Sequence, residues 1–478
     1  MSAATTAPPR RLPPLRPYPA TIANAIVARA LRRDGGSLSV EIARQGGKNE
    51  LSARAELALL LVRHAAGGTI VKCAPTLVPQ ARISLARLRD RAQEAGLGAA
   101  VVASADELRC GRARARFLSA DPAANVVGHT ADLLLEVDEA QDVDAETFDR
   151  AFRPMAASTN APVVFYGTPW GARSLLERAK ADHRAAERAG GPPRHYRCDW
   201  EQVAAHVPPY RAYVEAERAR LGERHPLFRT QYLLEVLHEA DRLLDASALA
   251  QLAGDHDRQS APRPGDRHVA GLDLGGPNLA PPGADRRDRD WTVLTIARVV
   301  ARSDGAPLLE VVEHHAWQGE ATEDLVARLA DLLRGVWRVR HLAVDATGLG
   351  APITDLLAAR LGRNVVEPVM FSAERKSRLG FALLAAVHSG RLRIYRMDGS
   401  RDWGTCRAQL EHARAAYAEG QRLQFDVDPA DGHDDYLMSL ALAVWAARHD
   451  DGPRAARGRT SPAASTSPLA TITERALA

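Results

Sequence analysis

The chain has 478 residues, which leaves room for two or three domains that each bury a core. Its hydrophobic content of 46% and charged content of 26% are typical of globular proteins, and its longest apolar run, residues 437–447, is shorter than the roughly 20 residues that span a bilayer. The net charge of +4 does not identify a nucleic-acid-binding protein by itself, and the four cysteines lack the paired spacing of a disulfide framework or a zinc site. The Arg- and Pro-rich start contains no apolar core and is not typical of a secretory signal, so we expect a cytoplasmic protein with no membrane partner.

The first part of the chain predicts an α/β domain over residues 21–195, preceded by a flexible basic arm at residues 1–20. From residue 36 onward, stretches with the hydrophobic pattern of strands alternate with stretches that have one apolar helical face. The expected strands are 37–43, 68–76, 99–104, 131–140 and 161–169, and the expected helices cover 49–65 and 78–95. This alternation predicts a mostly parallel sheet covered by helices.

The sequence "ARQGGKNE", residues 43–50, lies between the first expected strand and the following helix. It is close to the phosphate-binding pattern G-x-x-x-x-G-K-[ST], but Ile42 replaces the first glycine and Asn49 replaces the hydroxyl residue. Gly46 and Gly47 would let backbone N–H groups approach phosphates, and Lys48 would reach the terminal phosphates of ATP. The chain has only four lysines among its 63 basic residues, so a lysine at this position favours a function over an ordinary glycine turn.

Two further strand ends carry polar residues that fit the same site. Asp138 and Glu139 follow the buried strand in "DLLLEVDEAQ", where Asp138 could hold Mg²⁺ and Glu139 could polarise the attacking water. Thr168 and Pro169 end the next strand, at a position where a polar residue could sense the γ-phosphate. Together with the loop, these residues predict ATP hydrolysis, although each alone is also compatible with an ordinary strand end or helix cap.

The second part of the chain predicts another α/β domain. Residues 196–262 have the pattern of a helical linker, and we expect a domain at 263–450 and a disordered tail at 451–478. The expected strands are 268–275, 290–300, 308–317 and 339–346, with a helix at 322–336.

Four carboxylates in this part are candidates for a metal centre. Asp273 and Asp345 lie in apolar strands, and Asp434 and Asp435 open an apolar helix. If the fold brings them together, they could bind two Mg²⁺ or Mn²⁺ ions for phosphodiester cleavage, and Asp434 is the expected inner ligand of the adjacent pair. The alternative is that these acids cap turns and helices. His433 and Asp290 are weaker candidates, because a capping or turn role is the commoner outcome.

Taken together, these motifs over residues 36–448 resemble the large terminase subunit of tailed double-stranded DNA bacteriophages. That family has an N-terminal P-loop packaging ATPase with a deviant loop of the form R-Q-x-G-K-N, followed by an Asp-Glu pair and a coupling motif. In this sequence the pair is matched by Asp138 and Glu139, and the coupling motif by Thr168 and Pro169. Its C-terminal nuclease is similar to the RNase H and RuvC fold, with a mixed sheet.

The resemblance assigns expected roles to this sequence. It implies nucleotide binding by the loop, including Arg44 and Gln45, with Arg44 stabilising transition-state charge or sensing ATP. Asn49 departs from the usual hydroxyl, although an amide oxygen can also ligate Mg²⁺. The implied function is ATP-driven translocation of double-stranded DNA into a procapsid and metal-dependent cutting of concatemeric DNA. The implied partners are double-stranded DNA, the portal protein and the small terminase subunit, and the chain would form a homo-oligomeric ring, which is pentameric in the family. The implied location is the cytoplasm of the bacterial host and, transiently, the procapsid portal.

Two other classes of protein are compatible with parts of the pattern. A host-type ATP-dependent DNA repair helicase-nuclease would usually show a second motor domain, which we do not find after Pro169. A non-enzymatic prophage remnant or scaffold would not be expected to retain every lysine and acidic position.

Overall fold

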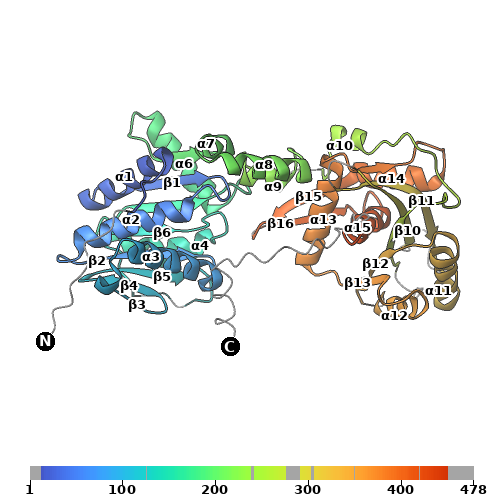
Figure 1. The fold of residues 1–478 in the computed structure, drawn as a ribbon, viewed down its shortest axis with the longest axis horizontal. Coiled ribbons are helices and arrows are strands. Elements are labelled where there is room, and N and C mark those ends of the chain that lie inside the picture. Colours follow the sequence, from blue (N-terminus) through green and yellow to red (C-terminus); the bar gives the residue numbers. More distant parts are fainter. Residues whose placement is uncertain are drawn as a thin grey trace, which may run out of the picture.

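The computed structural model describes residues 12–124, 126, 128–237, 242–275, 291–302, 306–348, 350–418 and 420–450. Two α/β domains lie side by side, with α8 (Pro208–Leu221) and α9 (Pro226–Gln231) between them (Figure 1). Among the described residues, no helix has both the length and the apolar character to cross a membrane.

The first domain is built on an eight-stranded sheet in the order β3-β4-β5-β2-β6-β7-β1-β8. Neighbouring strands from β5 to β8 in this order run parallel, whereas β3 and β4 extend the sheet as an antiparallel pair. The strands are β1 (Ser37–Ile42), β2 (Gly68–Ala74), β3 (Val101–Ala103), β4 (Glu107–Cys110), β5 (Ala113–Ser119), β6 (Leu134–Val137), β7 (Val163–Gly167) and β8 (His195–Cys198). The predicted mostly parallel sheet is therefore confirmed.

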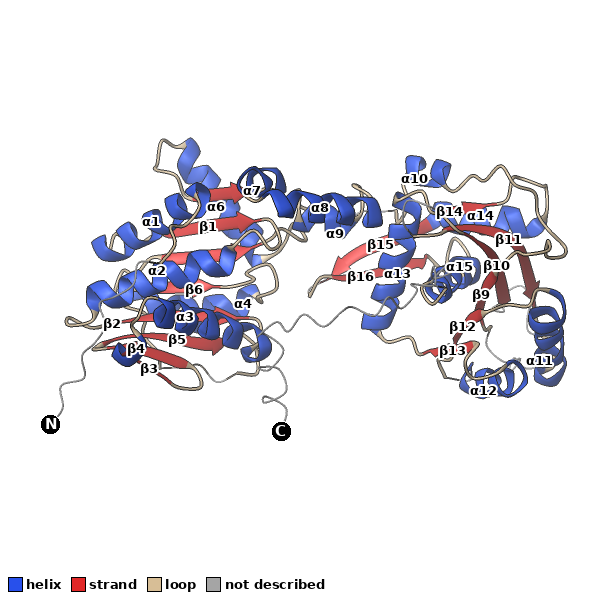
Figure 2. Ribbon diagram, viewed as in Figure 1, coloured by secondary structure: helices blue, strands red, loops and turns tan. Residues whose placement is uncertain are grey.

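Helices cover both faces of this sheet because its strands are apolar on both sides. The helices are α1 (Pro17–Arg32), α2 (Lys48–Arg63), α3 (Arg82–Glu94), α4 (Ala145–Thr147), α5 (Arg153–Ala157) and α6 (Leu175–Arg188), with π-helical turns at Leu77–Ala81 and Phe148–Phe152 and a 3₁₀ turn at Gly98–Ala100. One core lies between the sheet and α1–α3, and a second core lies between the sheet and α4–α6 (Figure 2).

Strands β4, β5 and β8 were absent from the sequence-based prediction. In β5, Arg114 and Arg116 interrupt the apolar pattern, yet both side chains have polar partners at the sheet surface. Arg114 Nε donates to Thr69 Oγ1 at 3.1 Å, and Arg116 Nε donates to Glu107 Oε2 at 2.7 Å. A strand whose charged residues are paired across the sheet does not show the hydrophobic signal on which the prediction relied.

Domain boundaries also differ from those expected. Helix α1 begins at Pro17, so the predicted arm over 1–20 is helical in its last residues, while residues 1–11 and 451–478 lie outside the described part. The first sheet continues past residue 195 into β8. In the predicted linker, α7 (Trp200–His206), α8 and α9 pack on the first domain, and α10 (Ala246–Gln251) packs on the second.

The second domain has a six-stranded mixed sheet in the order β13-β12-β9-β10-β11-β14, which confirms the expected mixed sheet. Pairs β9–β10 and β10–β11 are antiparallel, and pairs β12–β9, β12–β13 and β11–β14 are parallel. The strands are β9 (His268–Asp273), β10 (Thr292–Val300), β11 (Leu308–Trp317), β12 (His341–Asp345), β13 (Val366–Val369) and β14 (Leu392–Ile394).

Helices α11 (Thr322–Ala330) and α12 (Gly350–Leu361), with a π-helical turn at Asp331–Val336, cover one face of this sheet. The other face is covered by α13 (Ala373–His388), α14 (Arg401–His412) and α15 (Asp435–Ala447). A separate hairpin of β15 (Ala413–Ala418) and β16 (Arg422–Val427) extends from this domain toward the first one (Figure 2).

Helix α15 is the centre of the second domain, because all of its residues are buried against the sheet and its neighbouring helices. A glycine makes its close approach to β9 possible. A Cβ atom at Gly271 would lie 2.1 Å from the Ser439 carbonyl oxygen and 2.2 Å from the Ala443 nitrogen. The burial of α15 explains the long apolar run at residues 437–447, and it fixes the position of the two acids at the start of the helix.

Candidate functional site

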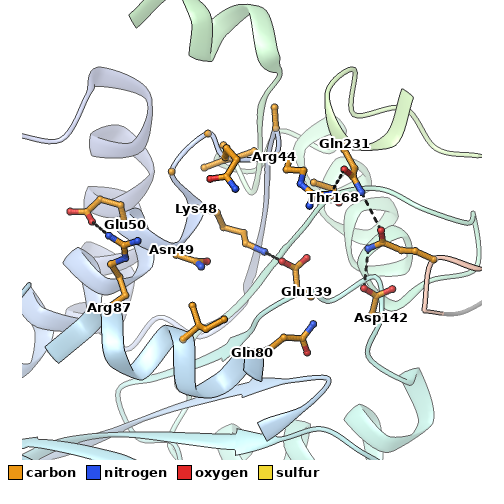
Figure 3. Close-up of a pocket in the computed structure, with 17 residues that line it drawn as sticks. Arg44, Lys48, Asn49, Glu50, Gln80, Arg87, Glu139, Asp142, Thr168 and Gln231 are labelled. Atoms are coloured by element: carbon orange, nitrogen blue, oxygen red, sulfur yellow. Dashed lines mark hydrogen bonds and ion pairs between the residues drawn. The ribbon is translucent and has the colours of Figure 1, made fainter. Parts of the chain in front are cut away.

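A pocket of about 710 Å³ opens where β1 ends and α2 begins, and the predicted phosphate loop forms one of its walls (Figure 3). The loop turns sharply, with Gln45 at φ 62° and Gly47 at φ 105°, and the second of these conformations strongly favours glycine. Helix α2 starts at Lys48 without a side-chain cap, so its first backbone N–H groups are available to an anion. Residues 44–49, which were singled out in the sequence, all line this pocket.

Two tyrosines that were not predicted from the sequence form hydrogen bonds with backbone carbonyls of the loop. The Tyr18 hydroxyl donates to the Gly46 carbonyl at 2.5 Å, and the Tyr210 hydroxyl donates to the Arg44 carbonyl at 2.6 Å. A Cβ at Gly46 would lie 2.6 Å from Ile42 Cγ2, so the loop is packed tightly on the end of β1. These contacts satisfy the loop carbonyls away from the pocket. The N–H groups of Arg44 and Gly46 donate to the carbonyls of Gln231 and Ala43, both at 2.8 Å, so a ligand would be bound by N–H groups of the other loop residues.

Lys48 connects the loop to the two acids that follow β6. Its Nζ lies 3.0 Å from Asp138 Oδ1 and 2.5 Å from Glu139 Oε1. Burial alone would raise the pKa of Asp138, but Lys48 and Lys72 outweigh this effect and hold the pKa at about 2. Burial would likewise lower the pKa of Lys48, and the two carboxylates raise it instead. The site therefore keeps an ammonium group and an ionised carboxylate side by side at neutral pH.

Glu139 is held in an unusual backbone conformation, with φ 48°, and its side chain is fixed by Gln141. Gln141 Nε2 donates to Glu139 Oε2 at 2.8 Å, and Gln141 Oε1 accepts from the Thr168 backbone N–H at 3.3 Å. Gln141 thus joins the expected water-polarising acid to the expected coupling residue. Gln141 was not predicted from the sequence, although it is the fourth residue of "DEAQ".

Arg44 and Asn49 occupy opposite sides of the pocket (Figure 3). Arg44 Nη1 donates to Gln231 Oε1 at 2.6 Å, which directs the guanidinium toward the segment that leads to the second domain. Asn49 lies in the first turn of α2, and Figure 3 shows its amide pointing toward the side of the pocket that holds Lys48 and Glu139. An amide oxygen at this position is a possible ligand for a hard cation.

The four acids of the second domain are brought together by the fold. Asp273 and Asp345 are the last residues of β9 and β12, which are neighbouring parallel strands. Asp434 and Asp435 lie at the start of α15, which packs on both of these strands. The sequence separated these residues by up to about 160 positions, and the sheet places them at one end of the domain.

The acids lie close enough to Asp273 to influence its ionisation. Burial raises the pKa of Asp273 well above its ordinary value, and Asp435, Asp345 and Asp434 raise it further, in that order, while Lys376 lowers it. Asp435 is buried and accepts from the Trp291 backbone N–H at 3.3 Å.

Asp434 is the more exposed member of the adjacent pair, and its Oδ2 lies 3.7 Å from Lys376 Nζ. Within the described residues, no group of three or more His, Cys, Asp or Glu side chains has the arrangement of a metal-binding site. Asp290 lies outside the described residues, and His433 directly precedes Asp434.

The comparisons with known proteins rest on structure. Neither a family model nor a curated protein matches the sequence. The fold is similar to the large terminase of a thermophilic bacteriophage, solved in several crystal forms. One of these forms gives a TM-score of 0.52 and 10% identity, with 90% of this chain and 98% of that chain covered.

Two nucleotide complexes of the same thermophilic phage protein also match. The complex with ADP gives a TM-score of 0.50 and 11% identity over 90% of this chain and 99% of that chain. The complex with ATP-gamma-S gives a TM-score of 0.50 and 10% identity, with 88% of this chain and 97% of that chain covered. At these identities the similarity establishes the fold. The chain therefore has the two-domain α/β fold of phage large terminases, as the resemblance in its motifs implied.

Proposed function

We propose that this chain is a large terminase subunit, which uses ATP hydrolysis to move double-stranded DNA into a procapsid and cuts concatemeric DNA with a metal-dependent nuclease. The observation that carries the proposal is the presence of two separate sites on one chain with this fold. One site is the pocket with Lys48 between Asp138 and Glu139, and the other is the acid group around Asp273.

In the first site, the loop residues 44–49 would bind the phosphates of ATP through backbone N–H groups and Lys48. Asp138, ionised and buried, is suited to hold Mg²⁺, and Asn49 could contribute its amide oxygen. Glu139, held by Gln141, would orient the attacking water. The similar large terminase of the thermophilic bacteriophage was solved with ADP and with ATP-gamma-S, which supports the same ligand class for this pocket.

In the second site, the four carboxylates carry the negative charge that a divalent cation would balance, although the described side chains are not arranged as a metal-binding group. Three carboxylates surround the buried Asp273, and the four acids repel one another. A cation between them would remove that repulsion and supply Lewis-acid activation of a phosphodiester. We assign the inner positions to Asp273, Asp345 and Asp435, because Asp435 is buried at the start of α15 whereas the Asp434 side chain is partly exposed. Asp434, paired with Lys376, would support the outer side of the site. The sequence had favoured Asp434 for the inner role.

We also propose the partners that the resemblance implies: double-stranded DNA, the portal protein, the small terminase subunit and a homo-oligomeric ring. A repair helicase-nuclease is less favoured, because the described residues contain one P-loop domain and one mixed-sheet domain and no second motor domain.

The test uses the purified full chain. We expect ATP hydrolysis that double-stranded DNA stimulates, and DNA cleavage that Mg²⁺ or Mn²⁺ supports and EDTA stops. Strand unwinding of a forked DNA duplex would instead support the repair helicase class, and a chain that neither hydrolyses ATP nor cuts DNA would contradict the proposal.

A further inference from the structure

The tip of the β15–β16 hairpin, which belongs to the second domain, forms part of the wall of the nucleotide pocket in the first domain. Gln421 lies at this tip and lines the pocket together with the phosphate loop. Its Nε2 donates to Asp142 Oδ2 at 3.1 Å, and its Oε1 accepts from Gln231 Nε2 at 3.3 Å. Figure 3 labels both partners, which lie on the side of the pocket opposite Asn49. A side chain of the nuclease domain is therefore in place to contact whatever the pocket binds.

A second contact fixes the hairpin on the segment that follows Thr168. Trp170, which is buried, donates its Nε1–H to the Ala418 carbonyl at 3.0 Å. The Trp170 ring packs edge-on against Tyr417 of β15, at 5.7 Å between ring centroids, and against Phe381 of α13, at 6.3 Å. The aromatic contacts and the indole hydrogen bond are of a kind that stabilises a specific domain contact. The position of the hairpin tip is thus set by the same segment that carries the expected coupling residue.

Strand β16 of the hairpin packs against helix α13, which carries Lys376 near the acid group. The Leu423 backbone N–H donates to Ser377 Oγ of α13 at 2.9 Å. A Cβ at Gly380 would lie 2.7 Å from the Phe425 ring, so α13 and β16 are in tight contact. Lys376 of the same helix faces both Phe425 and Asp434. The hairpin therefore forms a packed connection between the nucleotide pocket and the acids of the second domain.

We propose that Gln421 is a nucleotide-binding residue supplied by the second domain, so that nucleotide binding and the docking of the β15–β16 hairpin are thermodynamically linked. The proposal rests on the proposed function of the pocket as an ATP site. An amide nitrogen carries two N–H groups, of which Asp142 accepts one, and the other can donate to a phosphate oxygen or to a water that contacts it. Linkage is reciprocal: the factor by which docking strengthens nucleotide binding equals the factor by which nucleotide strengthens docking.

The substitution Gln421→Asn tests the contact with little change to the backbone. Gln421 has φ 56°, a conformation that asparagine adopts more readily than most residues, and the shorter side chain cannot reach as far into the pocket. Gln424→Asn is the matched control, because Gln424 is an exposed glutamine on the same hairpin and does not line the pocket. Isothermal titration of the full chain with ADP and ATP-gamma-S measures the effect. We expect Gln421→Asn to weaken binding roughly 3- to 10-fold, as for the loss of one hydrogen bond, and Gln424→Asn to bind like the parent.

Hydrogen exchange tests the linkage itself. We expect ADP to increase protection of amides in residues 413–427 of the parent chain, and to leave that protection unchanged in Lys48→Ala, which should not bind the nucleotide. At saturating ADP, the increase in amide protection of these residues should be much smaller in Gln421→Asn than in the parent, and this result would also support the proposal.

The outcomes separate this inference from the proposed function. If Lys48→Ala binds nucleotide like the parent, the pocket is not an ATP site and both ideas fail. If Lys48→Ala loses binding while Gln421→Asn and Gln424→Asn both bind like the parent, the ATP site stands and the role of Gln421 is overturned. Hairpin protection that does not respond to ADP in the parent chain would overturn the linkage in the same way.

Discussion

At the scale of single residues, the nucleotide pocket depends on charges that are stable only together. Lys48 contacts both Asp138 and Glu139, so the removal of Lys48 leaves two neighbouring carboxylates without their shared cation. The acidic pair and the lysine could be predicted from the sequence, because each follows or precedes a recognisable strand or helix. Tyr18 and Gln141 could not, because their roles depend on contacts that the local pattern does not encode.

Glu139→Gln should separate nucleotide binding from hydrolysis. Glutamine keeps the shape and can still contact Gln141, but it removes the carboxylate that would polarise water. We expect turnover to fall on the order of 100-fold or more while ADP affinity stays close to that of the parent. Lys48→Ala should lose both binding and turnover. Steady-state ATPase assays and titration with ADP measure these effects, with Asp273→Asn as a control that leaves this pocket intact. Parent-like turnover by Glu139→Gln would contradict the assignment.

The raised pKa of Asp142 predicts that the stability of the protein depends on pH. Burial raises the pKa of Asp142 from 3.8 to about 6, and hydrogen bonds from Gln421 and Gln141 oppose the rise. The folded state therefore binds this proton more tightly than the unfolded state. The resulting contribution favours folding at low pH and is lost as pH rises through about 6, by no more than about 3 kcal/mol.

Asp142→Asn removes this titration and keeps an oxygen that can accept from Gln421. We expect the variant to gain thermal stability over the parent at pH 8 and to show a clearly smaller gain at pH 5, as measured by calorimetry at both values. If Asp142→Asn differs from the parent in thermal stability by the same amount at both pH values, Asp142 is not the source of the pH dependence.

At the scale of elements, the sequence predicted best those strands and helices that are apolar throughout. Strands β1, β6 and β7 and helix α15 are buried and uninterrupted, and each was expected. Strand β5 was missed because its arginines are paired with residues from neighbouring strands. Local periodicity reports burial of a segment and does not report which distant partner neutralises a charge.

The contact of α15 with β9 makes Gly271 a sensitive position. A methyl group there would overlap backbone atoms of Ser439 and Ala443, which cannot move without displacing the helix. We expect Gly271→Ala to destabilise the second domain by about 3 kcal/mol and to lower DNA cleavage, because α15 carries Asp435. Gly335→Ala is the control, since a Cβ at Gly335 would meet no atom within 4 Å. Calorimetry and cleavage per folded molecule would measure both effects. Equal stability of the two variants would mean that the helix can shift freely.

At the scale of the whole molecule, the architecture could be predicted from the order of motifs, but the contact between the domains could not. Gln421 meets Asp142 across 279 positions of sequence, and nothing near either residue indicates the other. The same limit explains the choice between Asp434 and Asp435. Helical geometry predicts that only one of two consecutive acids points inward, and the packing of α15 decides which one.

Substitutions of the acid group should distinguish a metal site from capping acids. We expect Asp273→Asn to abolish Mg²⁺- or Mn²⁺-dependent cleavage and to leave ATP hydrolysis intact, because the pocket that we propose binds ATP lies in the other domain. Asp273 is buried among three further carboxylates, so its neutralisation also removes repulsion. In EDTA, the variant should therefore be at least as thermally stable as the parent, whereas added Mn²⁺ should stabilise the parent and leave the variant nearly unchanged.

Within the adjacent pair, Asp435→Asn should reproduce both the loss of cleavage and the loss of Mn²⁺ stabilisation. Asp434→Asn should retain a measurable fraction of each, because the Asp434 side chain is partly exposed and paired with Lys376. Capping acids would give the opposite pattern, in which each variant melts at a lower temperature and cuts DNA normally per folded molecule. Calorimetry with and without Mn²⁺, together with cleavage assays normalised to folded protein, decides between the two patterns. A fully active Asp435→Asn beside an inactive Asp434→Asn would restore Asp434 as the inner acid, because the residue that holds the metal must be the one whose charge the reaction cannot lose.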